Sequence, residues 1–445
     1  MREKQLVLLI SLFFIAMVGG YAQNSHPAWS SQTNIYEVNL RQYSASGSFK
    51  DFATHLTRLK NMGVQVLWFM PLTPIGIEGR KETTDELGSY YAVKDYKAVN
   101  PEFGTMNEWK ALVKKAHVMG FKVITDWVPN HSSPDNIWIK THPDFYKKDS
   151  AGNFMIPHDW SDTRKLNYDN RELRDSMIAA MKFWLKESDI DGFRCDVAGD
   201  VPTDFWKECI TSLRKIKNVF MLAEADKPEL HLAGFDETYG WSVMESMIKL
   251  VAGQKTLSQV DSQINHNIKA FPKNAYRLYF TTNHDWNSWE GTEFERYGDA
   301  YKTMAVFTQT MYQSVPLIYG GQEIPNKRRL KFFVKDPIEW KKFEMAPFYK
   351  TLLTLRKNNP ALAADASYRR LVTANDVAIF AYVRKKAGHK VAVILNLSNE
   401  PQKFRIRDKE LTGQPMNLFM GVKEKISDIH IYSIEPWGFI VYDFK

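Results

Sequence analysis

Apolar and polar positions follow one scheme over most of the chain: short β-rich runs are separated by amphipathic stretches with helical spacing. This alternation is typical of a parallel α/β fold. The strand-like runs cover residues 34–40, 64–70, 122–127, 189–196, 219–224, 234–237, 277–282 and 315–319. The helical stretches between them include residues 105–119, 171–187, 204–215, 258–270 and 301–313. Eight strands with intervening helices predict a (β/α)8 TIM barrel.

Two parts of the chain depart from this scheme. The connection at residues 129–170 is much longer than an ordinary loop and is rich in His, Asp, Trp and Pro. Long insertions in compact domains are usually functional. Near the C-terminus, short runs at residues 377–384, 390–397, 403–406 and 434–442 alternate apolar and polar positions. We therefore expect a barrel over residues 23–365, with an insertion at 129–170, followed by an antiparallel β-sandwich over residues 366–445.

The N-terminus predicts export. Arg2 and Lys4 precede an apolar run over residues 6–18, and small residues follow up to Ala22. This pattern is typical of a cleavable signal peptide over residues 1–22, and the apolar run is too short for a comfortable membrane span. We expect a secreted or periplasmic protein without stable membrane insertion. The chain has only Cys195 and Cys209, so no disulfide framework is expected.

Charge changes this picture little. The formal net charge is +8, but the basic residues are spread along the chain, and only residues 327–331 form a dense run. We interpret that run as a solvated loop, with nucleic-acid binding as the alternative. No nucleic-acid partner is expected, and the sequence does not determine the oligomeric state.

Polar clusters follow four of the predicted strands, where catalytic groups of such barrels lie. They are Asp126 to His131 after the third strand, Arg194 and Asp196 at the fourth, Glu224 at the fifth, and His284 with Asp285 at the seventh. A single Asp at a strand end is explained equally well as a helix cap. Four such clusters at one barrel mouth indicate a catalytic site instead.

Two of these carboxylates suit glycoside hydrolysis. A retaining glycosidase needs a nucleophile and a protonated acid about 5 to 5.5 Å apart, and adjacent strands can supply that spacing. Arg194 lies two positions before Asp196, so both side chains point the same way and the guanidinium is expected to hold Asp196 ionised. Glu224 follows the apolar residues 220–223, a setting expected to raise its pKa and keep its proton available.

These segments resemble the conserved motifs of the α-amylase family, glycoside hydrolase family 13. The similar segments are D-x-x-x-N-H at residues 126–131, G-F-R-C-D-V-A at 192–198, the strand end at Glu224 and T-N-H-D at 282–285. Further similarity lies at residues 35–37, 88–103 and 320–323, in family order, and the resemblance covers residues 30–445. It implies a barrel with an inserted B domain and a C-terminal β domain.

The resemblance also implies roles for individual residues. Asp196 is the expected nucleophile, Glu224 the acid/base, and Asp285 a third carboxylate that grips sugar hydroxyls. The residues expected to orient the sugar are Arg194, His131, His284 and Tyr91. Asp126 is expected to support the arginine. The implied substrate is an α-glucan or malto-oligosaccharide.

Other functions remain open at this stage. A metal-dependent hydrolase would also place Asp, His and Glu at a barrel mouth, but no histidine pair lies at helical or strand spacing near His131 or His284. A secreted starch-binding protein would use the many Trp residues as stacking surfaces. Within the family, an α-glucanotransferase or an enzyme acting on α-1,6 bonds is an alternative to a hydrolase of α-1,4 bonds.

The sequence departs from the family pattern at two places. Many α-amylases bind calcium with the asparagine that corresponds to Asn130 and with an aspartate. In this chain, Lys165 occupies the position of that aspartate. An ammonium can replace the ion electrostatically, so no metal and no cofactor are expected at this site. In addition, Gly199 and Asp200 replace a Lys-His pair that contacts the leaving-group side in many starch-cleaving members.

Overall fold

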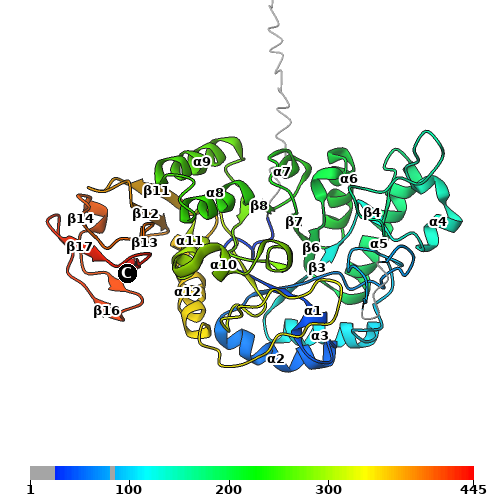
Figure 1. Ribbon diagram of the computed structural model, residues 1–445, viewed down its shortest axis with the longest axis horizontal. Coiled ribbons are helices and arrows are strands. Elements are labelled where there is room, and N and C mark those ends of the chain that lie inside the picture. Colours follow the sequence, from blue (N-terminus) through cyan, green and yellow to red (C-terminus); the bar gives the residue numbers. More distant parts are fainter. Residues whose placement is uncertain (1–25, 81–85, 445) are drawn as a thin grey trace, which may run out of the picture.

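The computed structural model describes residues 26–80 and 86–444. The predicted signal peptide, residues 1–22, lies outside these residues. Eight parallel strands form one sheet in which β10 pairs with β1, so that the sheet curls into a barrel (Figure 1). They are β1 (Ile35–Val38), β2 (Val66–Phe69), β3 (Lys122–Trp127), β6 (Gly192–Cys195), β7 (Phe220–Ala223), β8 (Glu237–Tyr239), β9 (Tyr276–Leu278) and β10 (Leu317–Tyr319). The predicted (β/α)8 barrel is confirmed.

Helices cover the outside of the barrel. They are α1 (Leu40–Tyr43), α2 (Phe49–Met62), α3 (Met106–Val118), α5 (Arg171–Ser188), α6 (Thr203–Arg214), α7 (Glu229–Ala233), α8 (Trp241–Val251), α9 (Leu257–Ala270), α10 (Glu293–Tyr297), α11 (Tyr301–Thr310) and α12 (Ala346–Asn358). Short 3-10 turns are η1 (Pro143–Phe145), η2 (Ala198–Asp200), η4 (Gly298–Ala300), η5 (Pro360–Leu362) and η6 (Lys409–Leu411), and η3 (Trp286–Glu290) is a π-helical turn. Thr105 and Glu108 form a capping box that starts α3 at its predicted position.

Alternation along the strands decides which side chains face the barrel interior. Phe220 and Leu222 belong to the inner apolar cluster, whereas Met221 and Ala223 belong to the cluster beneath the helices. Side chains two residues apart point to the same side of a strand, so Glu224 continues the inner series. The same spacing carries the inner series of β6 from Arg194 to Asp196.

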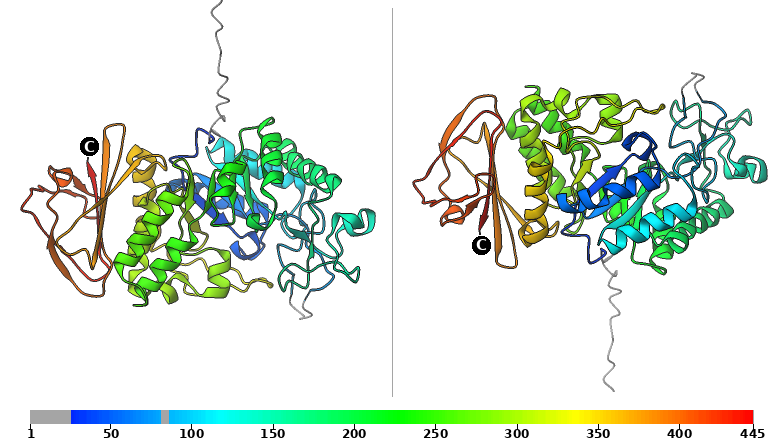
Figure 2. Two further views of the ribbon diagram at one scale, coloured as in Figure 1. Left: turned by 90° about the horizontal axis from the view of Figure 1, so that it is seen from above. Right: turned by 90° about the horizontal axis from the view of Figure 1, so that it is seen from below.

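The insertion after β3 contains little regular structure. Its elements are β4 (His131–Ser132), α4 (Ile137–Thr141), η1 and β5 (Arg164–Lys165), and β4 pairs with β5 in an antiparallel ladder. It lies on the opposite side of the barrel from the C-terminal sheet (Figure 2).

The C-terminal part is an antiparallel sheet. Its strands are β11 (Ser367–Leu371), β12 (Ile379–Lys386), β13 (His389–Asn396), β15 (Met416–Asn417), β16 (Val422–Lys423) and β18 (Phe439–Phe444), with a separate ribbon of β14 (Gln402–Arg405) and β17 (Ile431–Ile434). One face shares an apolar cluster with α8, α9, α11 and α12, and the other face packs against the ribbon. Among residues 26–80 and 86–444, no helix has both the length and the apolar character needed to cross a membrane.

The sixth predicted strand is misplaced. It was expected at residues 234–237, but residues 229–233 form α7 and the strand β8 begins only at Glu237. Gly234 ends α7 with a φ of 116°, a left-handed conformation that glycine adopts without a steric penalty. The glycine therefore marks a helix end and not a strand start.

Asp191 supplies a testable contribution to stability. Its buried carboxylate accepts hydrogen bonds from His117 Nε2 at 2.7 Å and from the Val123 N–H at 2.9 Å, and Lys217 Nζ lies 3.1 Å away. Burial raises its pKa, but these partners outweigh burial and lower the pKa to about 2. Since the unfolded chain has an ordinary Asp pKa, this stability is present above about pH 4 and is lost as the pH falls through about 2.

Asp191→Asn is therefore expected to lower the free energy of unfolding by about 2 kcal/mol near neutral pH. The difference in thermal midpoint from wild type should narrow as the medium is acidified. Asp175→Asn is the matched control, because Asp175 is 59% exposed and pairs with Arg171 instead of with the partners of Asp191. Equal midpoints at neutral pH, or a gap that does not change with pH, would contradict the expectation.

Candidate active site

The two expected reaction carboxylates leave neighbouring strands at one level. Cys195 of β6 pairs with Ala223 of β7, and the Glu224 N–H donates to the Cys195 carbonyl at 2.9 Å. Asp196 and Glu224 each follow directly after these paired residues. The barrel register therefore brings both side chains to the C-terminal mouth, where TIM-barrel enzymes carry their active sites.

Arg194 lies at the centre of the carboxylates. Its side chain is fully buried, and its Nη1 donates to Asp126 Oδ1 and to Asp196 Oδ1, each at 3.0 Å. Its Nη2 lies 2.6 Å from Glu224 Oε1. Asp126 supports the arginine as expected, and one guanidinium contacts three carboxyl groups.

Two electrostatic expectations need correction. The Glu224 carboxylate does not lie in an apolar setting, because its Oε2 accepts a 2.8 Å hydrogen bond from the Val197 N–H and its Oε1 faces Arg194. The apolar residues before it divide between the inner core and the helix layer. In addition, burial and the negative charge of Glu224 outweigh Arg194 and raise the pKa of Asp196 well above its usual range. Arg194 alone does not hold Asp196 ionised.

Asp126 shows the same effect. Burial raises its pKa to about 7 despite the two contacts from Arg194. A single arginine cannot fully stabilise several desolvated carboxylates. The buried cluster therefore retains a proton at pH values where an exposed Asp is fully ionised.

A second group of contacts fixes Asp285 on the other side of the site. His284 Nε2 lies 3.1 Å from Asp285 Oδ2 and 2.7 Å from the Tyr91 hydroxyl, and its Nδ1 lies 2.5 Å from Glu37 Oε1. Burial lowers the pKa of His284, but Asp285 and Glu37 outweigh it and raise that pKa well above the usual range. The positive charge of His284 overcomes burial at Asp285 and lowers the pKa of that carboxyl.

His131 faces the site as a neutral ring. Burial and the nearby charges of His158 and Lys165 lower its pKa to about 3. Within residues 26–80 and 86–444, its buried Nε2 atom has no hydrogen-bond partner, so it is available to a ligand. The insertion thus contributes a polar contact to the barrel mouth.

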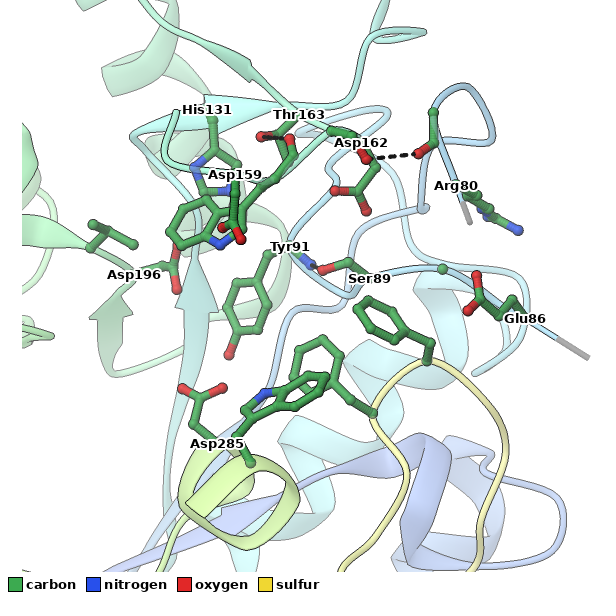
Figure 3. A pocket seen from close by; sticks show the side chains of 18 of the residues that line it. Arg80, Glu86, Ser89, Tyr91, His131, Asp159, Asp162, Thr163, Asp196 and Asp285 are labelled. Atoms are coloured by element: carbon green, nitrogen blue, oxygen red, sulfur yellow. Dashed lines mark hydrogen bonds between the residues drawn. The ribbon is translucent and has the colours of Figure 1, made fainter. Parts of the chain in front are cut away.

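Tyr91, His131, Asp196 and Asp285 line one cavity of about 400 Å³. Figure 3 shows Tyr91 between Asp196 and Asp285, with His131 and Asp159 at the other end of the cavity from Asp285. Glu224 and the rings of Trp160, Trp289 and Phe332 also contribute to its walls. A mixed lining of acidic, aromatic and hydrogen-bonding groups suits a polar ligand with apolar faces.

The structure brings together every site residue expected from the sequence. The sequence assigned no catalytic or sugar-orienting role to Glu37, Tyr239, Trp289 or Phe332, although Trp289 belongs to the Trp residues that a starch-binding protein would use as stacking surfaces. Tyr239 accepts a hydrogen bond from Arg194 Nε at 3.2 Å. Glu37 could have been identified from its spacing, because it lies two positions after the inward-facing Ile35, whereas Trp289 and Phe332 come from irregular segments without a periodic signal.

No metal-binding group emerges in the part of the chain that the structure describes. There, no cluster of three or more His, Cys, Asp or Glu side chains could hold an ion. Lys165 lies opposite His131 in the β4–β5 ladder, and the Leu166 N–H donates to the Asn130 carbonyl at 3.0 Å. Lys165 thus belongs to the segment that pairs with the residues next to Asn130.

Known proteins resemble this chain in sequence. A model of the α-amylase catalytic domain matches residues 30–161 and 147–347. The α-amylase MalA of Haloarcula japonica is 25% identical over 395 residues, which cover 84% of this chain and 57% of that protein. α-Amylase 3 of Dictyoglomus thermophilum is 25% identical over 401 residues, which cover 79% of this chain and 76% of that protein. The chain therefore spans less than two thirds of the Haloarcula relative.

The structure leads to the same family. The maltogenic α-amylase AmyB from Thermotoga neapolitana superimposes with a TM-score of 0.84 and 26% identity over 93% of this chain and 99% of that chain. The catalytic-domain matches together span residues 30–347, more than half of this chain. The protein therefore belongs to the α-amylase family of glycoside hydrolases, glycoside hydrolase family 13.

Proposed function

We propose that this protein is a retaining α-glycosidase that cleaves α-glucosidic bonds in malto-oligosaccharides or longer α-glucans. The observation that carries the proposal is the convergence of Asp196, Glu224 and Asp285 on one cavity, with Arg194 in contact with the first two. The α-amylase names of its relatives support the α-glucan as substrate.

The geometry supports a two-step mechanism. Glu224 donates a proton to the leaving oxygen while Asp196 Oδ2 attacks the anomeric carbon and forms a glycosyl-enzyme ester. This oxygen is buried and has no hydrogen-bond partner among the described residues, so its lone pairs are available. Glu224 then removes a proton from water, whose oxygen attacks the anomeric carbon and breaks its bond to Asp196 Oδ2, so that the product regains the original α configuration. Asp285, kept ionised by His284, accepts hydrogen bonds from sugar hydroxyls.

Burial retains a proton within the group of carboxyls around Arg194. The cluster around Arg194 holds a proton because Asp126 and Asp196 both have raised pKa values. The reaction needs that proton on Glu224 and a negative charge on Asp196.

Product analysis tests the proposal. Wild type and Asp196→Ala are incubated with maltoheptaose, and anomeric signals and chain lengths are followed by NMR. The proposal requires that only wild type forms products and that these are initially α-configured. The chain lengths then separate hydrolysis from glucanotransfer, and an α-1,6 oligosaccharide added in parallel tests the other linkage. Binding of maltoheptaose without turnover by either protein would favour a starch-binding role.

We also propose that the protein is exported to the periplasm or the medium. The charged start, the apolar run over residues 6–18 and the small residues up to Ala22 support cleavage of a signal peptide. N-terminal sequencing of the protein recovered from cell fractions should begin at Gln23. An intact Met1 start in the cytosolic fraction would reject export.

We expect activity without calcium. Lys165 supplies a positive charge where many relatives have a calcium-binding aspartate, and that ammonium already acts on His131. Exhaustive chelation should therefore leave kcat/KM on maltoheptaose within about twofold of the untreated value. Lys165→Asp is the informative variant, because it should reduce activity and introduce a response to calcium. Loss of wild-type activity that only calcium restores would contradict this expectation.

A further inference from the structure

Glu37 is a buried carboxyl group that the proposed mechanism does not use. It lies in β1, between β2 and β10, and its side chain has no exposed surface. Its Oε1 atom lies 2.5 Å from Nδ1 of His284. Its Oε2 atom is buried and has no hydrogen-bond partner in the part of the chain that the structure describes. The ring of His284 is therefore the group in direct contact that compensates a charge on Glu37.

The other ring nitrogen of His284 faces the cavity. Its Nε2 atom lies 2.7 Å from the Tyr91 hydroxyl and 3.1 Å from Asp285 Oδ2. The Tyr91 hydroxyl donates its own proton to Asp126 Oδ2 at 3.3 Å, so the Tyr91 oxygen is left to accept a hydrogen bond. An ionised Asp285 also only accepts. Both neighbours of Nε2 therefore require a hydrogen on that nitrogen.

These contacts fit a doubly protonated ring. A neutral imidazole has one N–H and one lone pair, whereas an imidazolium donates from both nitrogens. An ionised Glu37 requires a hydrogen on Nδ1, and Tyr91 with Asp285 requires one on Nε2. The alternative is a neutral ring that accepts a proton from an uncharged Glu37. Imidazole ordinarily holds a proton more strongly than a carboxylate does, which places the proton on His284.

Other titratable groups face this pair from several elements of the barrel. They are Tyr91, Asp126, Arg194, Tyr239, Asp285 and Tyr319. Burial raises the pKa of Glu37, and the positive charges of His284 and Arg194 oppose that rise. Burial lowers the pKa of His284, and Asp285 and Glu37 outweigh it. A negative Glu37 and a positive His284 therefore stabilise each other.

The charge on His284 matters for Asp285. When Nε2 carries a hydrogen, the ring donates to Oδ2 and favours the ionised carboxylate. When Nε2 carries a lone pair, that lone pair faces the carboxylate and disfavours its charge. In the proposed function, Asp285 accepts hydrogen bonds from sugar hydroxyls, which is the task of an ionised carboxylate.

We propose that Glu37 is a positioning residue for the glycosidase reaction, which fixes His284 as an imidazolium with its Nε2 hydrogen directed at Tyr91 and Asp285. Glu37 is fully buried and is not among the residues that line the cavity, so it acts through His284. This inference rests on the proposed function and adds a residue that does not touch the substrate.

Two variants separate charge from packing. Glu37→Gln keeps the size of the side chain and removes its charge, whereas Glu37→Asp keeps the charge and shortens the side chain by one methylene. Nitrogen NMR with isotope-labelled histidine reads the ring directly, because the two ring nitrogens have similar shifts in an imidazolium and widely separated shifts in a neutral ring. His284→Gln identifies the signal. We expect an imidazolium in wild type and Glu37→Asp at neutral pH, and loss of the proton at a lower pH in Glu37→Gln.

The kinetic effect should depend on pH. At pH values where the ring of Glu37→Gln is neutral, kcat/KM on maltoheptaose should fall about 10- to 100-fold. The ratio of wild-type to Glu37→Gln activity should grow as the pH rises, because wild type keeps the proton that the variant loses. Glu293→Gln is the matched control, since Glu293 is a buried carboxyl that contacts Thr281 and Gln322 instead of His284. Its His284 signal should match that of wild type.

The outcomes distinguish this role from the proposed function. A neutral His284 in wild type at neutral pH would overturn the proposal, and this measurement needs no variant to fold. The same conclusion follows if His284 titrates alike in wild type and Glu37→Gln, or if Glu37→Gln loses activity equally at every pH while Glu37→Asp retains no more. A wild-type protein that has a charged His284 but does not cleave maltoheptaose would instead overturn the proposed glycosidase function.

Discussion

Asp196→Ala is expected to lower kcat on maltoheptaose by about 10⁵-fold or more while the protein stays folded. Loss of a nucleophile removes the covalent route, and reductions of this size are typical when one member of a catalytic unit is deleted. The fold should tolerate the change, because Asp196 is a buried carboxylate whose charged form is disfavoured by burial and by Glu224. A thermal midpoint equal to or above that of wild type is therefore expected.

Azide rescue separates loss of the nucleophile from general damage. Alanine leaves a space on the side of the anomeric carbon from which Asp196 attacks, and a small anion can enter it. With an activated α-glucosyl donor, azide should restore turnover and give a β-configured glucosyl azide. Asp175→Asn is the matched control, since Asp175 is an exposed carboxylate paired with Arg171 outside the site. Rescue that gives an α-configured product, or an active Asp196→Ala enzyme, would reject the nucleophile assignment.

Periodicity explains how much of the fold could be predicted. The strand ends at Asp126, Arg194 and Glu224 lie where the alternation placed them, because long apolar runs specify both the strand and its inner face. The predicted position of the sixth strand was wrong because β8 has only three residues, too few for a periodic signal, and because the turn at Gly234 precedes it. The two-residue strands β4 and β5 depend on tertiary contacts of the insertion and carry no local pattern.

The site shows a different limit of sequence-based prediction. Motifs identified the residues, but the protonation of the cluster depends on how many charges one buried guanidinium must stabilise. The two-residue spacing between Arg194 and Asp196 predicts that these side chains meet. It does not predict that Asp126 and Glu224 contact the same guanidinium. Similarly, the spacing of residues cannot predict that Trp289 meets Phe332, because both belong to segments without regular repeats. Such contacts become visible only in three dimensions.

Glu224→Gln should separate acid catalysis from nucleophilic attack. Glutamine keeps the size of the side chain and can still accept the Val197 N–H at its amide oxygen, but it cannot give a proton to the leaving oxygen. On maltoheptaose, whose leaving group needs that proton, kcat/KM should fall by about 10³-fold. The fluoride of α-glucosyl fluoride leaves without protonation, so on this substrate the glycosyl-enzyme should form nearly as fast as in wild type. The loss of activity in Glu224→Gln should therefore depend on the leaving group.

The pH profile gives an independent check on this role. In wild type, activity on maltoheptaose should decline at high pH as the cluster around Arg194 loses its retained proton. In Glu224→Gln this basic limb should disappear, because the proton that is lost no longer takes part in the reaction. Azide should accelerate breakdown of the glycosyl-enzyme and give an α-configured azide, opposite to the product from Asp196→Ala, because it attacks the anomeric carbon from the side that Glu224 serves and displaces the Asp196 carboxylate. Equal losses on both substrates with the basic limb intact would assign the acid role to another residue.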